Sequence, residues 1–282
     1  QNEILTVATA NFEGVLSFAY HLEGLTHVDG MALVDNALAA ENNQLSQGAF
    51  VGMRGVSAPR QVRDPETEYL AKVLSQKGKE GIFLQQHEGS LLPENVMGFF
   101  TGAQFIHDTF PYLDFHPGAM ADNVTSYGAV DANWLCSDTG CPENEVQTAI
   151  GHLIALGASQ VHGTVDEPLN NSFPNAGAYY LYDAGYTAAE SWLYNQPFLF
   201  WQNAYWGDGL AAPFATRPSL EVLSVDGELR MSAHHESGIA WLGVFQAGRL
   251  LADTTQPNLN IQLTEVLEKE LLVVAQAKTF ED

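Results

Sequence analysis

Residues 157–174 read Gly-Ala-Ser-Gln-Val-His-Gly-Thr-Val-Asp-Glu-Pro-Leu-Asn-Asn-Ser-Phe-Pro. Gly157 is a natural end for a preceding helix, because glycine enters the left-handed conformation without a steric penalty. A short β-type run follows, and Asp166 and Glu167 come directly after it in a polar, proline-closed loop. An open α/β sheet builds its site in this way, from polar groups at the carboxyl end of a buried strand. We expect the functional centre here, unless Asp166, Glu167 and Asn170 only cap a loop.

Around this stretch, helix-type and strand-type patterns alternate, which predicts an α/β fold with a mainly parallel sheet and helices on its faces. Four helices are expected, over residues 28–45, from Asp64 onward, over 143–156 and over 188–194, and further strands over 48–53, 81–85 and 96–101. Residues 102–142 carry repeated turn signals, so a long, loop-rich connection is expected there. One apolar face is predicted for the first helix from the spacing of Met31, Val34, Leu38 and Leu45.

The pattern changes after Pro218. Five short apolar runs follow with no helix between them, at residues 220–225, 228–233, 239–245, 259–263 and 270–275. Turns such as Asp226-Gly227 separate these runs, which is typical of a small antiparallel β-sandwich of the Ig-like kind. The expected organisation is therefore an α/β domain over residues 1–217 and an Ig-like domain over residues 218–282.

The chain has 282 residues, of which 46% are hydrophobic, so it can bury a sizeable core. Its charge is unusual: 34 Asp and Glu residues against 11 Lys and Arg residues give a formal net charge of −23. Nucleic acid and anionic membrane surfaces would repel such a chain, which argues against both as partners. A solvated acidic surface is the simplest interpretation, and an extracellular or saline setting and calcium loading are the alternatives.

No apolar run is long enough to span a membrane, and no basic, apolar leader opens the sequence. Gln1 at the start suggests a processing site or a chosen end of the chain. Cys136 and Cys141 are separated by four residues and lack the second pair that a zinc site needs. A small disulfide-closed loop in an oxidising compartment is the favoured interpretation, with two free thiols as the alternative.

Several different short motifs occur one after another along residues 20–215. They are Asp35–Glu41, Arg54-Gly55, Thr101-Gly102, Pro117–Gly128, Gly157-Ala158, Gly163–Pro168, Phe173-Pro174, Gly185–Glu190 and Gly207–Phe214. In this series the chain resembles a family of secreted bacterial proteins with a PGA-AD-LTS-GG, GAT-GTV-EP, FP and GDPL-PF pattern. No activity is established for that family. The resemblance implies a secreted or cell-surface bacterial protein of which this chain is the C-terminal half.

More distantly, the layout is similar to the gingipain-type cysteine peptidases, in which an α/β domain of caspase-like fold precedes an Ig-like domain. Their chemistry places a His at the end of one strand and a Cys at the end of the next. The corresponding positions here are Thr101-Gly102 and the Pro117–Ser126 region, and neither offers that pair. One branch of the bacterial family also has a cysteine after its Glu-Pro, where this chain has Leu169. The resemblance therefore implies the scaffold without the dyad.

Catalytic candidates remain, although none has a complete motif. His87 lies in His-Glu-Gly-Ser, and His162 lies in the central β-type run. Ser126 lacks the Gly-x-Ser-x-Gly context of a nucleophile elbow. Glu167 is adjacent to Asp166, and on an extended strand the two side chains would face opposite sides. Structural roles for all four candidates stay open beside the catalytic ones.

A hard-cation site is the second possibility. Calcium prefers oxygen ligands, and Asp122, Asp166, Glu167 and Asp208 are the acidic residues placed near expected strand ends. The sequence contains no EF-hand, HExxH, P-loop or dinucleotide glycine motif. Calcium is therefore the one cofactor that the sequence suggests.

Two functions compete. The first is an extracellular, non-catalytic protein with a peptidase-like scaffold that acts in a surface layer, filament or other assembly. It is motivated by the missing dyad, the aromatic-rich residues 192–206 and the β-rich tail, and its partners would be further copies or its own N-terminal fragment. The second is a secreted peptidase-type hydrolase whose remaining catalytic residues lie on an absent N-terminal half. The first is preferred, and whether the chain is an enzyme stays open.

Overall fold

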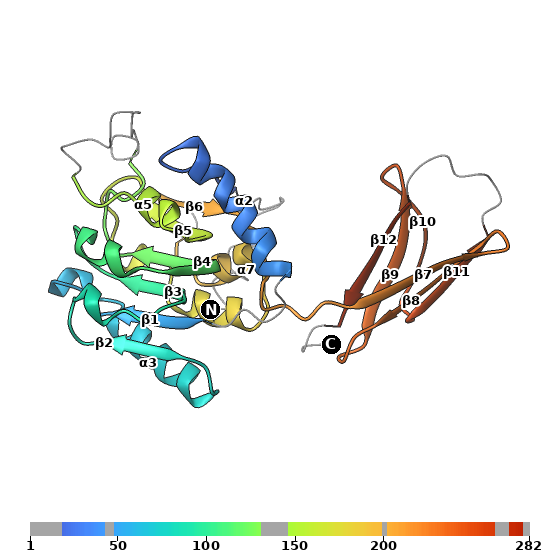
Figure 1. Ribbon diagram of the computed structural model, residues 1–282, viewed down its shortest axis with the longest axis horizontal. Helices are drawn as coiled ribbons and strands as arrows, with labels where there is room; N and C mark the ends of the chain where they lie inside the picture. The colour runs from blue at the N-terminus through green and yellow to red at the C-terminus, as the bar shows by residue number, and fades with distance from the viewer. Residues whose placement is uncertain (1–18, 43–47, 131–145, 199–201, 263–270, 279–282) are drawn as a thin grey trace. The chain divides into compact units, whose positions relative to one another are not determined.

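The computed structural model describes residues 19–42, 48–130, 146–198, 202–262 and 271–278 (Figure 1). The chain divides into two compact units, Gln1–Ala215 and Thr216–Asp282. The first unit is an α/β unit with one sheet, and the second contains two small antiparallel sheets. The predicted combination of an α/β region and a β-rich tail is confirmed.

The sheet of the first unit has six strands in the order β2-β1-β3-β4-β5-β6. Pairing is parallel from β2 through β5, and β6 runs antiparallel to β5. The central strands are buried along their length, which explains why they read as apolar runs rather than as alternating ones. The strands are β1 (Ala49–Met53), β2 (Gly81–Leu84), β3 (Val96–Thr101), β4 (Phe115–Asn123), β5 (Gln160–Thr164) and β6 (Asn203–Gly207).

Helices cover both faces of this sheet. They are α2 (His27–Asn42), α3 (Asp64–Gln76), α5 (Gly151–Ala155), α6 (Gly177–Asp183) and α7 (Ala188–Tyr194). On one face, Phe50 packs against Tyr179 of α6 and Phe100 against Trp192 of α7, with ring centroids 4.8 and 6.1 Å apart. On the other face, a side chain at Gly118 would meet Ala40 of α2, and α5 packs beside α2 and β5.

The inward face of α2 differs from the predicted one. Leu33, Ala37 and Ala40 are buried, whereas Met31 and Leu38 are 52% and 55% exposed. The helix carries apolar residues nearly all round, so spacing alone could not tell which side faces the sheet. Leu45, the fourth residue of the predicted face, lies outside the described residues.

One predicted helix is shorter than expected, and one predicted loop contains a strand. A helix is expected over residues 143–156, of which the structure describes those from residue 146 onward. The observed helix α5 begins only at Gly151, and Val146 is exposed. The region expected to be a loop, residues 102–142, contains the central strand β4. Pro117 and Gly118 are typical of a turn, but they lie where the pairing of β4 with β3 shifts register, which a bulged strand allows.

The second unit consists of the sheets β10-β9-β12 and β11-β8-β7. Its core is formed by Leu229, Met231 and Ala233 of β8 together with Ile239, Leu242 and Val244 of β9. The hairpin between β7 and β8 turns at Asp226-Gly227, where both residues have positive φ, as a type I′ turn requires. The strands are β7 (Ser219–Val225), β8 (Glu228–His234), β9 (Ile239–Gln246), β10 (Arg249–Thr254), β11 (Asn258–Gln262) and β12 (Leu271–Ala277), of which β10 was not predicted.

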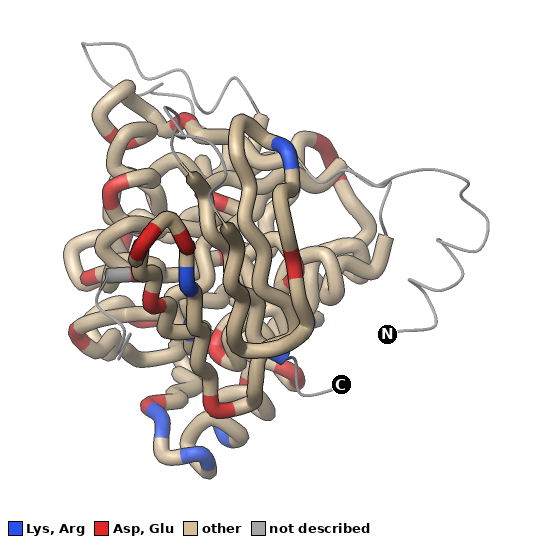
Figure 2. The backbone as a smooth tube through the Cα atoms, turned by 90° about the vertical axis from the view of Figure 1, so that its right-hand side faces the viewer, with Lys and Arg blue, Asp and Glu red and all other residues tan. Residues whose placement is uncertain are grey.

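Acidic positions are spread along the whole backbone, whereas basic positions are few (Figure 2). The six Lys and Arg residues of residues 1–215 all lie between Arg54 and Lys79. This part of the chain contains the loop after β1 and the helix α3. The Lys and Arg residues of the α/β unit are therefore confined to one short stretch of its sequence.

Candidate functional site

The carboxyl ends of the parallel strands meet at one edge of the sheet, where α/β proteins place their sites. Asp166 and Glu167 follow β5, as the sequence predicted, and Ser126 follows β4, a strand that lies in the region expected to be a loop. The Ser126 hydroxyl donates a hydrogen bond to Glu167 Oε1 at 2.9 Å. Asp166 accepts one from the backbone N–H of Glu167 at 2.7 Å, which is a local turn contact. The structure therefore brings Ser126 and Glu167 together at this edge.

Tyr127 belongs to the same cluster. Its pKa is raised above the ordinary tyrosine value, first by desolvation and then by the nearby carboxylates of Glu167 and Asp166. A phenol in this position stays protonated at neutral pH and acts as a hydrogen-bond donor. The cluster offers a hydroxyl, a phenol and two carboxylates, which suits binding through hydrogen bonds more than nucleophilic attack.

His162 does not lie in this cluster. Its side chain is fully buried on β5, with Nδ1 at 3.0 Å from Asp122 Oδ1 and Nε2 at 2.7 Å from Asn203 Oδ1. Asn203 Nδ2 donates to the Ser172 carbonyl, which fixes the orientation of its amide. Both imidazole nitrogens face oxygen atoms within the core, so His162 has the geometry of a structural residue.

Asp122 is the centre of this buried network. Its other oxygen lies 2.5 Å from Nη1 of Arg63, and both side chains are almost completely buried. Burial alone would raise the pKa of Asp122, but the adjacent His162 and Arg63 outweigh it and hold the pKa below its ordinary value. Both oxygens of this buried carboxylate are engaged with protein side chains, which gives Asp122 the surroundings of a structural ion pair and not those of a calcium ligand.

The carboxyl ends of β3 and β4 are closed by Asn123. Its Oδ1 accepts from the Ala103 N–H at 2.8 Å, and its Nδ2 donates to the Ala103 carbonyl at 3.0 Å. Thr125, two residues further on, donates to Gln147 Oε1 at 2.5 Å, and both side chains are buried. Sequence reasoning missed Asn123, whose one signal is a polar amide shortly after the apolar residues 119–121.

His87 lies above the ends of β1 and β3. Its Nδ1 is 3.4 Å from the Arg54 carbonyl and 3.5 Å from Thr101 Oγ1, both at the limit of a hydrogen bond. Its Nε2 is shielded from solvent and has no hydrogen-bond partner among the described residues. His87 is therefore placed at the carboxyl edge of the sheet, but no carboxylate within the described ranges forms a hydrogen bond with its ring.

The four predicted calcium ligands do not assemble. Asp208 follows β6, which runs antiparallel with Gly207 opposite Gln160, so it lies at the start of β5 rather than at its end. Its Oδ1 accepts from the Leu210 N–H at 2.9 Å. Within the described ranges, no group of three or more His, Cys, Asp or Glu side chains could hold a metal ion. The predicted disulfide between Cys136 and Cys141 lies outside the described residues.

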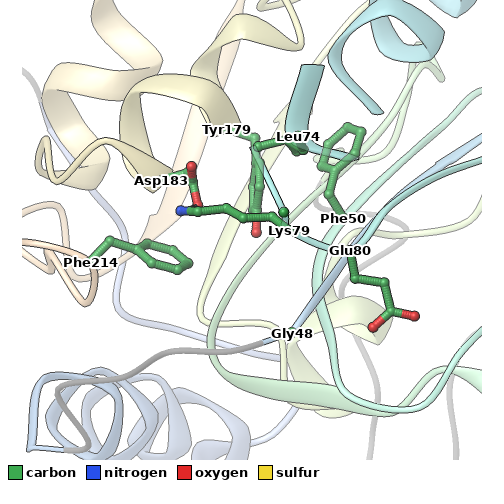
Figure 3. Close-up of a pocket in the computed structure, with 9 residues that line it drawn as sticks. Gly48, Phe50, Leu74, Lys79, Glu80, Tyr179, Asp183 and Phe214 are labelled. Atoms are coloured by element: carbon green, nitrogen blue, oxygen red, sulfur yellow. Dashed lines mark hydrogen bonds and ion pairs between the residues drawn. The ribbon is translucent and has the colours of Figure 1, made fainter. Parts of the chain in front are cut away.

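A cavity of about 410 Å³ opens at the opposite, amino-terminal edge of the sheet (Figure 3). Phe50, Tyr179 and Phe214 contribute its aromatic lining. The Asp183 carboxylate is 5% exposed and forms an ion pair with Lys79, whose Nζ lies 5.4 Å from the Phe214 ring centroid. Aromatic rings and a buried carboxylate suit an ammonium group, and the chain's own lysine takes that position.

No known protein family has a model that matches the sequence, and no curated protein matches it either. Among the described residues, no helix combines the length and hydrophobicity needed to cross a membrane.

Proposed function

We propose that the chain is an extracellular, non-catalytic protein in which a peptidase-like α/β scaffold of caspase-like type serves a cell-surface layer, filament or other assembly. The observation that carries this proposal is the closure of the carboxyl ends of β3 and β4 by Asn123. In the gingipain-type resemblance, these two strand ends would carry the catalytic His and Cys. Here they carry Thr101 and an amide whose two hydrogen bonds both go to Ala103.

The layout of the chain supports the same proposal. A mainly parallel six-stranded sheet is followed by two small antiparallel sheets, in the order that the resemblance implies. The candidate His162 is buried and bonded on both nitrogens, which leaves no imidazole beside Ser126 in the contacts of the described residues. A serine hydroxyl that is paired with a carboxylate and has no imidazole as general base lacks the usual activation of a serine nucleophile.

A peptidase-type hydrolase is the second candidate function. It is favoured by the hydrogen bond between Ser126 and Glu167 at the sheet edge, where His87 also lies. Such an enzyme would need the remaining catalytic residues from the N-terminal fragment of the same protein.

Two measurements separate these functions. Light scattering after size exclusion, at high protein concentration with and without calcium, is expected to show assemblies larger than a monomer. Serine- and thiol-directed activity probes are expected to leave the full-length protein unlabelled, with Ser126→Ala as the matched control for any serine signal. Probe labelling that disappears in Ser126→Ala and in Glu167→Gln would establish the hydrolase and refute the proposal.

A further inference from the structure

One edge of the second unit is a strand exposed along its whole length. All seven residues of β7 are exposed, although four of them are apolar. Leu220, Val222, Leu223 and Val225 are 38%, 43%, 49% and 40% exposed. Edge strands of stable monomers are normally short, charged, bulged or covered, so an apolar and uncovered edge needs an explanation.

The backbone of β7 also has unused hydrogen-bonding groups. The two-residue turn at Asp226-Gly227 makes Val225 and Glu228 a hydrogen-bonded pair, and such pairs then recur at every second residue. The N–H and C=O groups of Leu220, Val222 and Ser224 consequently point away from β8. In the described part of the chain, β8 is the only strand that pairs with β7.

The side chains on this edge continue the core of the unit. Leu220 lies opposite Ala233 and Val222 opposite Met231, so they share a face with buried core residues of β8. Ala233 and Met231 are 5% and 2% exposed, whereas their neighbours on β7 are about half uncovered. The apolar face that is buried on β8 therefore continues onto β7, where it is exposed.

Both edge strands of this sheet carry little charge, with one carboxylate on β7 and none on β11, but only on β7 are the exposed side chains largely apolar. Glu221 is the only charged residue of β7, which contains no Lys, Arg or Pro. The other edge of the same sheet is the shorter strand β11, whose exposed positions include Asn258 and Asn260. In a chain with a net charge of −23, two copies repel each other little at an edge strand that carries a single carboxylate.

We propose that the β7 edge binds the β7 edge of a second copy of this chain. Antiparallel pairing about a two-fold axis at Val222 places Leu220 opposite Ser224 of the second copy, and Glu221 opposite its Leu223. Three hydrogen-bonded pairs form, each exchanging two bonds, and the two Glu221 carboxylates are not directly opposed. The two core faces join into one continuous sheet, an isologous contact of the kind that closes a dimer.

The contact between two β7 edges would be the one through which the proposed assembly forms, so it rests on the proposed function. Val222→Pro is the test variant, because it removes an N–H that points to the open edge and is not bonded to β8. Asn260→Pro is the matched control, since register places its N–H on the other open edge of the same sheet. Circular dichroism and thermal unfolding establish that both variants fold.

Sedimentation velocity of the full chain over a concentration series gives the result. The wild-type protein and Asn260→Pro are expected to dimerise alike, and Val222→Pro is expected to weaken the dimer by roughly 30-fold or more, from two lost hydrogen bonds. Equal association of Val222→Pro and the wild type would overturn the β7 contact and leave the assembly standing. A wild-type monomer at high concentration would overturn both.

A cross-link tests the register of the same contact. Under oxidation Val222→Cys is expected to give a covalent dimer, because the two-fold axis brings the two copies of this position within the range that a disulfide spans. Ser224→Cys is the control, since the axis separates its two copies. The linked peptide identified by mass spectrometry distinguishes this bond from one made by Cys136 or Cys141. Cross-linking of Ser224→Cys as efficiently as Val222→Cys would refute the register.

Discussion

Asp122 is the residue on which the interior of the α/β unit depends most. Its carboxylate is the counter-charge of the buried Arg63 guanidinium and also bonds His162. Asp122→Asn keeps the shape of the side chain, but the 3.4 Å contact with Glu66 is then the one ion pair left to Arg63 among the described residues. We expect a loss of about 3 kcal/mol or more in the free energy of unfolding, because breaking a buried ion pair strands the remaining charge. Urea denaturation measures it, with the exposed Asp166→Asn as the control expected to change little.

The lowered pKa of Asp122 predicts that the protein loses stability at acidic pH. A carboxyl whose pKa is lower in the folded than in the unfolded protein stabilises fully above the unfolded value of about 3.9. This contribution is lost as the pH falls through the folded value, and the pKa of Asp122 is held low in this way by His162 and Arg63 against the effect of burial. The difference in unfolding free energy between wild type and Asp122→Asn should stay constant from about pH 7 to 5 and shrink below about pH 4. A difference that grows on acidification would contradict this assignment.

At the scale of single elements, substitutions on the two apolar sides of α2 show which side contributes to the free energy of unfolding. Leu33 is fully buried and Leu38 is 55% exposed on the same helix. The same change, Leu to Ala, should therefore cost about 2–5 kcal/mol at Leu33 and less than about 1 kcal/mol at Leu38. Chemical denaturation of the two variants measures both costs. Equal costs would mean that the exposed side of α2 is covered in solution.

The helix α7 begins with a capping box. The Thr187 hydroxyl accepts from the Glu190 N–H at 3.2 Å, and Glu190 Oε2 accepts from the Thr187 N–H at 2.9 Å. Thr187→Ala should lower the free energy of unfolding by about 1 kcal/mol, while Thr187→Ser keeps the cap and should be nearly neutral. Thermal or urea unfolding compares the two. A loss as large in Thr187→Ser would assign the effect to the methyl group instead of the cap.

Elements whose local pattern agrees with their environment could be predicted from the sequence. The buried strands β1, β3 and β5 and the capped helix α7 are of this kind, because each carries its signal within a few residues. The strand β4 could not be predicted, since its Pro117-Gly118 bulge resembles a turn and only pairing with two neighbours makes it a strand. Glu167 could be selected by its position after the predicted strand β5, but the position of Ser126 after β4 could not be predicted. The closure by Asn123 could not, because it depends on contact with Ala103, which lies on another segment of the chain.

At the scale of the whole molecule, the net charge of −23 should set how stability responds to salt. Among the basic residues, Arg63 and Lys79 are already paired with Asp122 and Asp183, so they compensate little of the remaining negative charge. Raising NaCl from about 0.05 M to about 0.5 M shortens the Debye length and weakens repulsion between exposed carboxylates. It changes buried pairs such as Arg63–Asp122 much less, so the repulsive contribution is the one removed.

We therefore expect the melting temperature to rise with NaCl, by about 2–4 °C for each ~1 kcal/mol of repulsion relieved. KCl should act equally, because screening depends on ionic strength and not on the identity of the cation. Calorimetry in NaCl, in KCl and in CaCl2 at matched ionic strength separates screening from ion binding. An additional rise of the melting temperature in CaCl2 alone would indicate a specific calcium site. A fall of the melting temperature in all three salts would show that attractive surface ion pairs outweigh the repulsion.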